Sequence, residues 1–511
     1  MKYNPIIGLE IHVELRTKSK MFCGCVNDSD ERHPNVQICP ICLGHPGTLP
    51  VINKEAVRKV IKTGLALNCQ IPEVSKFDRK NYFYPDLPKG YQISQYDKPF
   101  CKEGYLKMDG RKIRITRVHL EEDTGKLIHP EGVDYSLVDF NRAGIPLMEL
   151  VTEPDITSAK EARIFAEELQ LILCYLGVSD ADMEKGQMRV EVNISLSKSK
   201  KLGTKVEIKN LNSFRSVEKA IDYEIKRQTE VLNEDKKVIQ ETRGWNEAKG
   251  ITVSQRKKEE SYDYRYFPEP DLPTLHLNKR FIQEIKAEIP ELPQQRRERF
   301  AKEYNLNEKV VKIFISNKNL GEYFEKVMSE LINWVNPVRG YNDKMKVQRR
   351  QTSNGVKETE IKEKISNQEF LKLTNLAANY IITDFWSLFG KVLIKELEGK
   401  ISPENFAEMI KMIYKGEISS KIAKQILPEM LKGADPSHII EEKGLTQVSN
   451  VLELEKIIKD VIFKNQKAVE DYKKGKESAL QFLVGQIMAA TRGRAKPDIV
   501  QKILKKELGS L

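Results

Sequence analysis

The sequence lacks any hydrophobic run long enough to cross a membrane. In its 511 residues there is no stretch of about 18 consecutive apolar residues, roughly the length that a transmembrane helix needs. Residues 1–5 also lack the long apolar core of a signal peptide. Hydrophobic residues make up 40% of the chain and the mean hydropathy is −0.50, as in soluble globular proteins, so we expect a cytoplasmic location without a membrane partner.

Several common catalytic signatures are also missing. The sequence contains no G-x-x-x-x-G-K-[ST], no kinase Asp-Phe-Gly, no G-x-S-x-G and no H-E-x-x-H. We therefore expect neither a common nucleotide-binding fold nor a serine hydrolase.

Cysteine is scarce, but four of the seven cysteines lie close together. Cys23, Cys25, Cys39 and Cys42 have the spacing C-x-C-x13-C-x2-C. A Cys-x2-Cys turn lets two thiolates reach one tetrahedral ion, and Gly44 relieves the tight backbone. In a cytosolic chain this spacing favours zinc over disulfides or free thiols. Four thiolates leave no open position on the ion, so we predict a structural zinc site.

Basic residues exceed acidic ones only slightly. Lys and Arg number 85 and Asp and Glu 74, a difference of 85 − 74 = 11, and the isoelectric point is near 9.0. This bias permits an anionic partner such as RNA without requiring one.

The sequence patterns change along the chain, which is too long for one hydrophobic core. Residues 1–290 are rich in strand patterns and in Gly and Pro turns, whereas residues 291–435 and 436–511 have helical patterns. Residues 339–369 are highly charged and poor in large apolar groups, which indicates an insertion with little core of its own. We predict an α+β fold with a β-rich domain, a helical domain and a small helical tail.

Two helices are predicted within the β-rich part. Ser158 and Glu161 form a capping-box pattern before an apolar stripe, and Gly177 is placed to end that helix. A second helix is expected over residues 217–232.

Four short segments alternate apolar and charged residues. They are residues 9–15 (LEIHVEL), 113–117 (IRITR), 189–195 (RVEVNIS) and 205–209 (KVEIK). Side chains alternate across a strand, so each segment buries one face and presents polar groups on the other. For any one strand a solvated outer face is the simpler interpretation, but it accounts less well for four such segments.

The polar groups on these strands suit a cation and phosphates. Carboxylates with one imidazole fit Mg²⁺ or Mn²⁺, and we predict that Glu10, His12, Glu122 and Glu191 form such a centre. Four cationic residues are expected to neutralise the phosphates of a nucleotide, namely Lys80, Arg142, Lys205 and Lys209. This set of residues points to phosphoryl transfer.

Longer motifs resemble one known family, the B subunits of the aspartyl/glutamyl-tRNA(Asn/Gln) amidotransferases. The similar segments are residues 8–15 (GLEIHVEL), 77–86 (FDRKNYFYPD), 91–95 (YQISQ), 119–123 (HLEED), 139–147 (DFNRAGIPL), 263–271 (DYRYFPEPD) and 482–488 (FLVGQIM). They occur in order from end to end of the chain, and only the charged insertion stands outside the resemblance.

The resemblance implies a cytoplasmic enzyme of three subunits, a carbon–nitrogen ligase with glutamine as amide donor. It converts Glu-tRNA(Gln), Asp-tRNA(Asn) or both to the correct amide. The B subunits of this family use ATP and Mg²⁺ to phosphorylate the side-chain carboxylate, and they bind the tRNA. Of the accompanying A and C subunits, the first is a glutaminase that releases ammonia from glutamine, and the second is a small clamp. The family fold is a β-rich cradle followed by a helical domain and a helical tail that contacts the tRNA body.

Carried over by position, the resemblance assigns the metal and phosphate centre to Glu10, His12, Glu122 and Glu191. The family often has Asp where this chain has Glu191, and its zinc-type cysteines occur in only some members. Two alternatives stay open: a zinc-stabilised tRNA-docking module without chemistry, which leaves His12 and the carboxylates unexplained, and an aminoacyl-tRNA synthetase, for which no signature is found.

Overall fold

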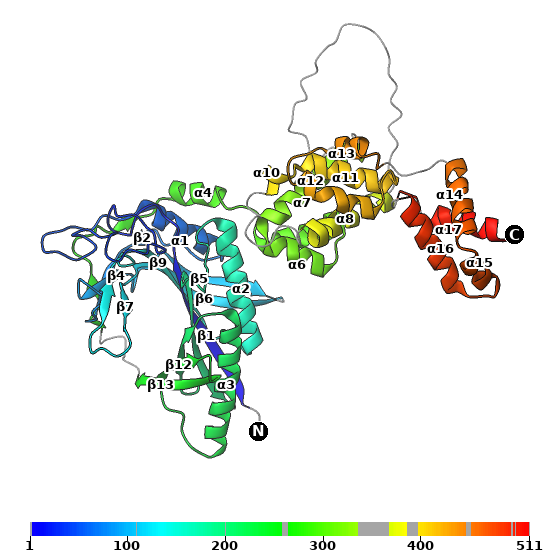
Figure 1. Ribbon diagram of the computed structural model, residues 1–511. Helices are drawn as coiled ribbons and strands as arrows, with labels where there is room; N and C mark the ends of the chain where they lie inside the picture. The colour runs from blue at the N-terminus through cyan, green and yellow to red at the C-terminus, as the bar shows by residue number, and fades with distance from the viewer. Residues whose placement is uncertain are drawn as a thin grey trace, which may run out of the picture. The chain divides into compact units, whose positions relative to one another are not determined.

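The computed structural model forms two compact units, residues 1–293 and 294–511 (Figure 1). The described residues are 3–108, 110–199, 201–257, 264–335, 367–385, 397–445, 451–491, 494–495 and 497–509. The predicted insertion therefore lies outside the described residues except for its last three positions. The division at residues 290 and 435 into three domains stays a prediction.

A sheet of eight strands forms the centre of the N-terminal unit. Its strands, in spatial order, are β13 (Ile251–Lys257), β12 (Glu241–Asn246), β11 (Val206–Leu211), β10 (Met188–Ser197), β1 (Asn4–Glu14), β9 (Pro146–Thr152), β6 (Arg111–Glu122) and β5 (Cys101–Met108). All neighbours are antiparallel except β11 and β12. The four strands predicted from alternation are all present, and an unpredicted strand, β9, separates two of them.

Three further sheets, of two or three strands each, accompany the large one in the described part of this unit. They are β14 (Phe267–Pro268) with β3 (Asp78–Asn81) and β4 (Tyr91–Ser94), β15 (Leu275–His276) with β2 (Val74–Ser75), and β7 (Lys126–Ile128) with β8 (Leu137–Asp139). The first of these, which we call the small sheet, is tied to the large sheet because the Ser94 hydroxyl donates to Glu121 Oε2 at 2.8 Å.

The helices of this unit are α1 (Lys54–Ala66), α2 (Ala159–Leu176), α3 (Phe214–Asn233) and α4 (Lys279–Ala287). Both predicted helices are confirmed. Helix α2 begins where the Ser158 side chain accepts the Glu161 N–H, and it ends at Gly177, whose φ of 65° suits glycine. Figure 1 shows α2 and α3 beside the sheet, and α3 packs on β10.

The core of this unit explains which face of the sheet is polar. Ile7, Leu9, Ile11 and Val13 of β1 are buried in one apolar cluster with Phe165 and other α2 side chains. Burying such a side chain contributes about 1.5–3 kcal/mol. Alternation then directs the even-numbered side chains of β1 to the opposite face.

The C-terminal unit is helical in its described part. Its helices are α5 (Pro293–Tyr304), α6 (Glu308–Ser316), α7 (Lys318–Val335), α8 (Asn367–Tyr380) continuing into the π-helical turn η2 (Ile381–Phe385), α10 (Leu397–Lys400), α11 (Pro403–Lys415), α12 (Ser420–Met430), α13 (Pro436–Glu442), α14 (Val451–Lys464), α15 (Gln466–Lys473), α16 (Glu477–Ala490) and α17 (Pro497–Gly509). The last four share a core around Leu483 and Ile487. The α+β class is confirmed, and no helix among the described residues is long and apolar enough to span a membrane.

Candidate active site and metal centres

The polar face of the large sheet carries a row of ionisable side chains directly opposite one another. His12 of β1 pairs in register with Glu149 of β9 on one side and with Arg189 of β10 on the other. Glu149 in turn pairs with His119 of β6. Adjacent strands lie about 4.8 Å apart, so residues paired in this way bring their side chains into contact.

Five side chains from three strands meet along this row, and we call them the acidic cluster: Glu10, His12, His119, Glu121 and Glu149. His12 Nε2 lies 3.4 Å from Glu149 Oε2, 3.8 Å from Glu121 Oε1 and 4.0 Å from Glu10 Oε1. His119 Nε2 lies 3.5 Å from Glu149 Oε2 and 3.5 Å from Glu121 Oε2. Glu121, Glu149 and His119 are buried, so water cannot screen their charges.

The donor set of the acidic cluster fits a divalent cation. In two overlapping groups, Glu10 with His12 and Glu149 and His119 with Glu121 and Glu149, the ligand atoms lie within 4.8 Å of one another. Carboxylate oxygens with imidazole nitrogen suit Mg²⁺ or Mn²⁺. Buried carboxylates this close repel one another, and a bound cation would remove that repulsion.

The close spacing of these buried groups shifts the pKa values of Glu149, His12 and Glu10. Burial alone would raise the pKa of the Glu149 carboxyl, but His119, His12 and Lys80 hold that pKa well below its usual range. Burial also opposes the charging of His12, yet Glu149, Glu121 and Glu10 raise the pKa of its imidazole to about 9. For Glu10, burial and then the charge of Glu149 raise the pKa.

Glu191 lies next to the cluster. It is directly opposite Glu10 in the register of β10 and β1. Ligand oxygens of Glu10, Glu191 and Glu207 lie within 4.8 Å of one another. Lys209 Nζ lies 2.9 Å from Glu191 Oε2, which balances one of these negative charges. The structure therefore brings together three of the four predicted centre residues, namely Glu10, His12 and Glu191.

Glu122 is not in the acidic cluster. Strand alternation turns it to the face opposite Glu121, where it forms an ion pair with Lys89 and accepts the Ile93 N–H at 3.0 Å. A methyl group on Gly144 would lie 3.4 Å from Cys42 Cβ and 4.0 Å from Glu122 Oε2, which places Glu122 close to the cysteine group.

Three members of the cluster were absent from the predicted centre, namely His119, Glu121 and Glu149, and Glu149 is the least obvious of them from the sequence. It is the only charged residue of β9, whose other side chains are almost all buried. The signal was present in the sequence as one carboxylate within an apolar run, because such a charge is rarely buried without a partner. Glu121 had a simpler signal, since it is two residues from His119 and so shares its face.

Of the predicted phosphate-binding cations, Lys80 and Lys209 lie at the polar face. Burial would lower the pKa of the Lys80 ammonium, but the charges of Glu121 and Glu149 outweigh this effect and raise it. Arg142 instead donates to the carbonyls of residues 124 and 125 at 3.1 and 2.8 Å. Lys205 is exposed just before β11.

The four predicted zinc cysteines form one group. Their Sγ atoms lie within 4.8 Å of one another, and the sulfurs of a tetrahedral zinc site are about 3.8 Å apart. The Cys39 N–H donates to Cys42 Sγ at 3.2 Å. The ammonium of Lys20 is completely buried, donates to the Gln37 carbonyl at 2.6 Å and lies 3.9 Å from Cys42 Sγ. This arrangement can bind a metal and place a compensating positive charge beside it.

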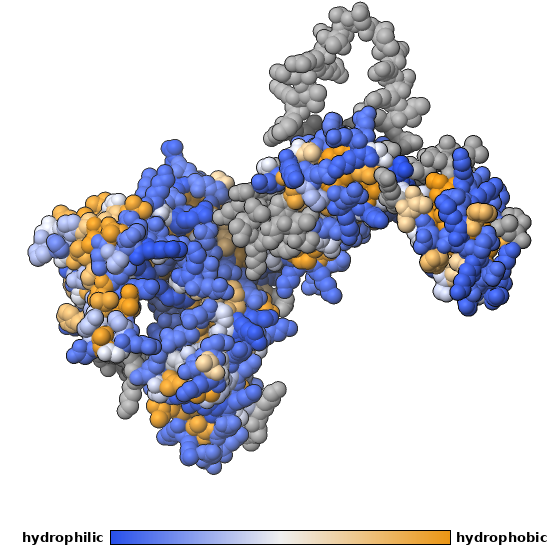
Figure 2. Space-filling view, viewed as in Figure 1, coloured by the Kyte–Doolittle hydropathy of each residue, from blue (hydrophilic) through white to orange (hydrophobic). Residues whose placement is uncertain are grey.

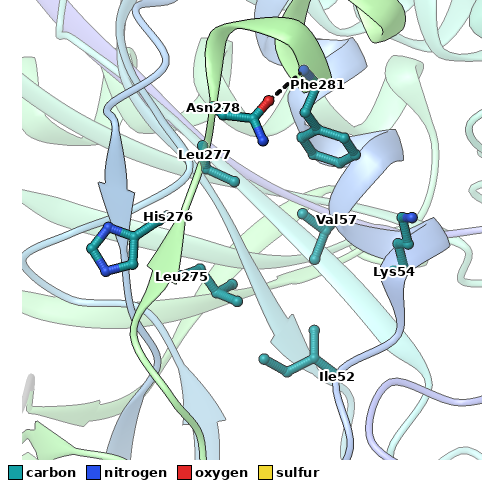
Figure 3. Close-up of a pocket in the computed structure, with 8 residues that line it drawn as sticks. All are labelled: Ile52, Lys54, Val57, Leu275, His276, Leu277, Asn278 and Phe281. Atoms are coloured by element: carbon teal, nitrogen blue, oxygen red, sulfur yellow. Dashed lines mark hydrogen bonds between the residues drawn. The ribbon is translucent and has the colours of Figure 1, made fainter.

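An apolar hollow of about 360 Å³ lies elsewhere in this unit, between the start of α1 and the segment joining β15 to α4 (Figure 3). It is lined by Ile52, Lys54, Val57, Leu275, His276, Leu277, Asn278 and Phe281. In Figure 3 the Leu275 side chain points toward Val57, whereas His276 points away from it. With no carboxylate or thiol in its lining, the hollow does not offer the chemistry of the acidic cluster.

Two family descriptions match the sequence. The one described as the GatB/GatE catalytic domain matches residues 5–283, and the one described as the GatB domain matches residues 361–508. The first match contains the whole acidic cluster and the four cysteines.

Curated relatives match over almost the entire length. The chain is 47% identical to a Thermotoga maritima protein over 520 residues, covering 99% of both chains. It is 47% identical to a Thermoanaerobacter sp. protein, covering 99% of this chain and 100% of the relative. It is 45% identical to a Carboxydothermus hydrogenoformans protein, covering 100% of both. All three relatives are named as B subunits of aspartyl/glutamyl-tRNA(Asn/Gln) amidotransferases.

Proposed function

The chain belongs to the family of aspartyl/glutamyl-tRNA(Asn/Gln) amidotransferase B subunits, and from this premise we propose that it activates the side-chain carboxylate of an amino acid esterified to tRNA. Its substrate is Glu-tRNA(Gln), Asp-tRNA(Asn) or both. It works in the cytoplasm with the A and C subunits of a heterotrimer, of which the first is the glutaminase, so that glutamine is the amide donor. This reaction is that of a carbon–nitrogen ligase.

The chemistry needs two steps because a carboxylate is a poor electrophile. A side-chain carboxylate oxygen first attacks the terminal phosphorus of ATP, and ADP leaves. Ammonia then attacks the carbonyl carbon of this acyl phosphate, inorganic phosphate leaves, and a proton is lost to give the amide. Phosphoryl transfer depends mostly on positioning and charge stabilisation, so the chain must supply a charged and ordered surface rather than a nucleophile.

The acidic cluster is the site that we assign to the first step. Glu10, His12, Glu121 and Glu149 would hold a divalent cation, with His119 beside them. When bound, that cation would offset the charge of phosphate oxygens. The positive charge of Lys80, which interacts with Glu121 and Glu149, can attract a phosphoryl group. Zinc at the cysteine group would be structural, because four thiolates fill its coordination sphere.

The observation that carries this proposal is the convergence of Glu10, His12, Glu121 and Glu149 from three strands in a chain of this family. The test is to purify the chain with its A and C subunits and measure amide formation on mischarged tRNA with ATP and glutamine. We expect ATP-dependent product with at least one of the two tRNAs. Absence of product with both, in a complex that still hydrolyses glutamine, would refute the proposal.

We also propose that the tail, residues 436–511, binds the body of the tRNA. Its last four helices have their own core, which supports an independent role. Deleting the chain after residue 435 should weaken tRNA binding while glutamine hydrolysis by the complex continues. Unchanged tRNA affinity at moderate salt would instead assign the tail to assembly.

A further inference from the structure

Exposed aromatic side chains concentrate around the small sheet. Five aromatic residues are exposed in the described part of residues 3–293, and four of them lie on or beside this sheet: Phe83, Tyr84, Tyr96 and Phe267. Phe83 and Tyr84, which we call the aromatic pair, are 81% and 56% exposed. Figure 2 shows hydrophobic residues over the region where Figure 1 places β4 and β7. Clustered exposed apolar groups mark a binding surface more often than scattered ones do.

The loop that carries the aromatic pair is fixed in place. It joins β3 to β4, and Leu87 within it is buried. Asp86 accepts the Gly125 N–H at 2.8 Å through its carbonyl and the Thr124 hydroxyl at 3.1 Å through its carboxylate. A methyl group on Gly90 would lie 3.2 Å from a ring carbon of Phe83, so the ring lies close to that glycine. The two exposed rings thus belong to a loop that is fixed by the buried Leu87 and by the hydrogen bonds of Asp86.

The same loop leads directly into the candidate active site. Lys80 is three residues before Phe83, and its charge interacts with Glu121 and Glu149 of the acidic cluster. The Lys80 ammonium also lies 5.8 Å from the ring centre of Tyr82 and 5.0 Å from that of Tyr264. The aromatic pair therefore follows, by three and four residues along the chain, a lysine whose charge interacts with the acidic cluster.

A positive charge accompanies this surface. The Arg265 carbonyl accepts a hydrogen bond from Asn81 Nδ2 at 2.8 Å, and the exposed Arg265 has a φ of 45°, which is unusual for a residue other than glycine. Asn81 is two residues from Phe83, so this hydrogen bond fixes the backbone of Arg265 close to the start of the loop. A nucleic acid matches both features, because its planar bases stack on aromatic rings and its phosphates carry negative charge.

We propose that Phe83 and Tyr84 form a stacking platform for the unpaired bases at the aminoacylated 3′ end of the tRNA. This inference rests on the proposed function, which requires that end of the RNA to reach the acidic cluster. Single-stranded RNA is commonly held by bases stacked on aromatic side chains, with a cation on the backbone. The platform fixes the end of the RNA, and Lys80 with Tyr82 lines the path of the esterified side chain.

The experiment uses the assembled complex and uncharged tRNA with 2-aminopurine, a fluorescent base, in place of the 3′-terminal adenine. Stacking quenches this fluorophore, so binding to the wild type should reduce its emission. Phe83→Leu keeps apolar volume but removes the aromatic face, and Phe83→Trp restores it. We expect loss of quenching in Phe83→Leu, recovery in Phe83→Trp, and about a tenfold or greater rise in KM for mischarged tRNA in the double variant Phe83→Ala/Tyr84→Ala.

The matched control is Ile239→Ala, which removes an exposed apolar side chain of the same unit outside the small sheet. It should leave quenching and KM unchanged. Full quenching in Phe83→Leu, or failure of the Phe83 variants to assemble with the A and C subunits, would overturn the platform. Because quenching is measured on uncharged tRNA, this result is separate from the amidation assay that tests the proposed function.

Discussion

The two candidate metal centres of the N-terminal unit are built in opposite ways. The cysteine group takes four identical ligands from 20 consecutive residues, positions 23–42, and its turn is closed by hydrogen bonds within the motif. The acidic cluster takes its ligands from three strands that are distant in sequence. A site of the first kind stabilises a local loop, whereas one of the second kind requires the complete sheet. The difference suits a structural role for one and a chemical role for the other.

Glu149→Gln should separate these two roles most strongly. Removing one charge from the acidic cluster should lower ATP-dependent amidation at least about 100-fold, because the remaining groups no longer balance a divalent cation. The melting temperature should fall less markedly than the activity, because the side chain keeps its shape although His12, His119 and Lys80 lose a charged partner. The measurement is kcat for amide formation together with the melting temperature, and retained glutamine hydrolysis controls for assembly. Full activity would remove Glu149 from the proposed centre.

Cys42→Ser should show the opposite pattern. Loss of one thiolate should destabilise the N-terminal unit by about 3 kcal/mol or more, because metal affinity contributes to folding free energy. The measurement is denaturant unfolding with zinc content by metal analysis. Cys174→Ser is the matched control, because Cys174 is exposed and outside the cysteine group. Equal stability of the two variants would argue against a structural metal.

Glu14→Gln should have the smallest effect and a distinct pH dependence. Burial, and then the charge of Asp123, raise the pKa of the Glu14 carboxyl to about 7. The folded state therefore holds a proton that the unfolded state releases near pH 4.5, and stability falls as pH rises between these values. At pH 8, with both proteins free of metal, the variant should thus be more stable than the wild type by about 1–3 kcal/mol. At pH 4 the two proteins should have similar stability. A constant difference at both pH values would show that Glu14 does not titrate in this range.

The features of the N-terminal unit that follow from the sequence alone have local determinants. The start and end of α2 follow from Ser158 and Gly177, and the grouping of the four cysteines follows from two short spacings. Each of these depends on contacts within a few residues, so the pattern alone is sufficient.

The composition of the acidic cluster depends instead on strand pairing. The position of β9 between β1 and β6 brings Glu149 between His12 and His119, and no local pattern specifies that neighbour. Whether Glu121 or Glu122 faces the cluster depends on which residues of β6 point to the polar face of the sheet. His119 could have indicated this, because residues two apart in a strand share a face and Glu121 is two residues from His119. Both the strand pattern and the family resemblance were used to place Glu122 in the centre, but the structure pairs Glu122 with Lys89.

The central claim is that one divalent cation is held by the face of the sheet that carries Glu121. Its most direct test is a titration of the assembled complex with Mn²⁺, a paramagnetic substitute for Mg²⁺, followed by electron paramagnetic resonance of the free ion. We predict that Glu121→Gln weakens binding at least about tenfold while Glu122→Gln leaves the affinity within about twofold of wild type. Unchanged affinity in Glu121→Gln, with loss in Glu122→Gln, would contradict the account.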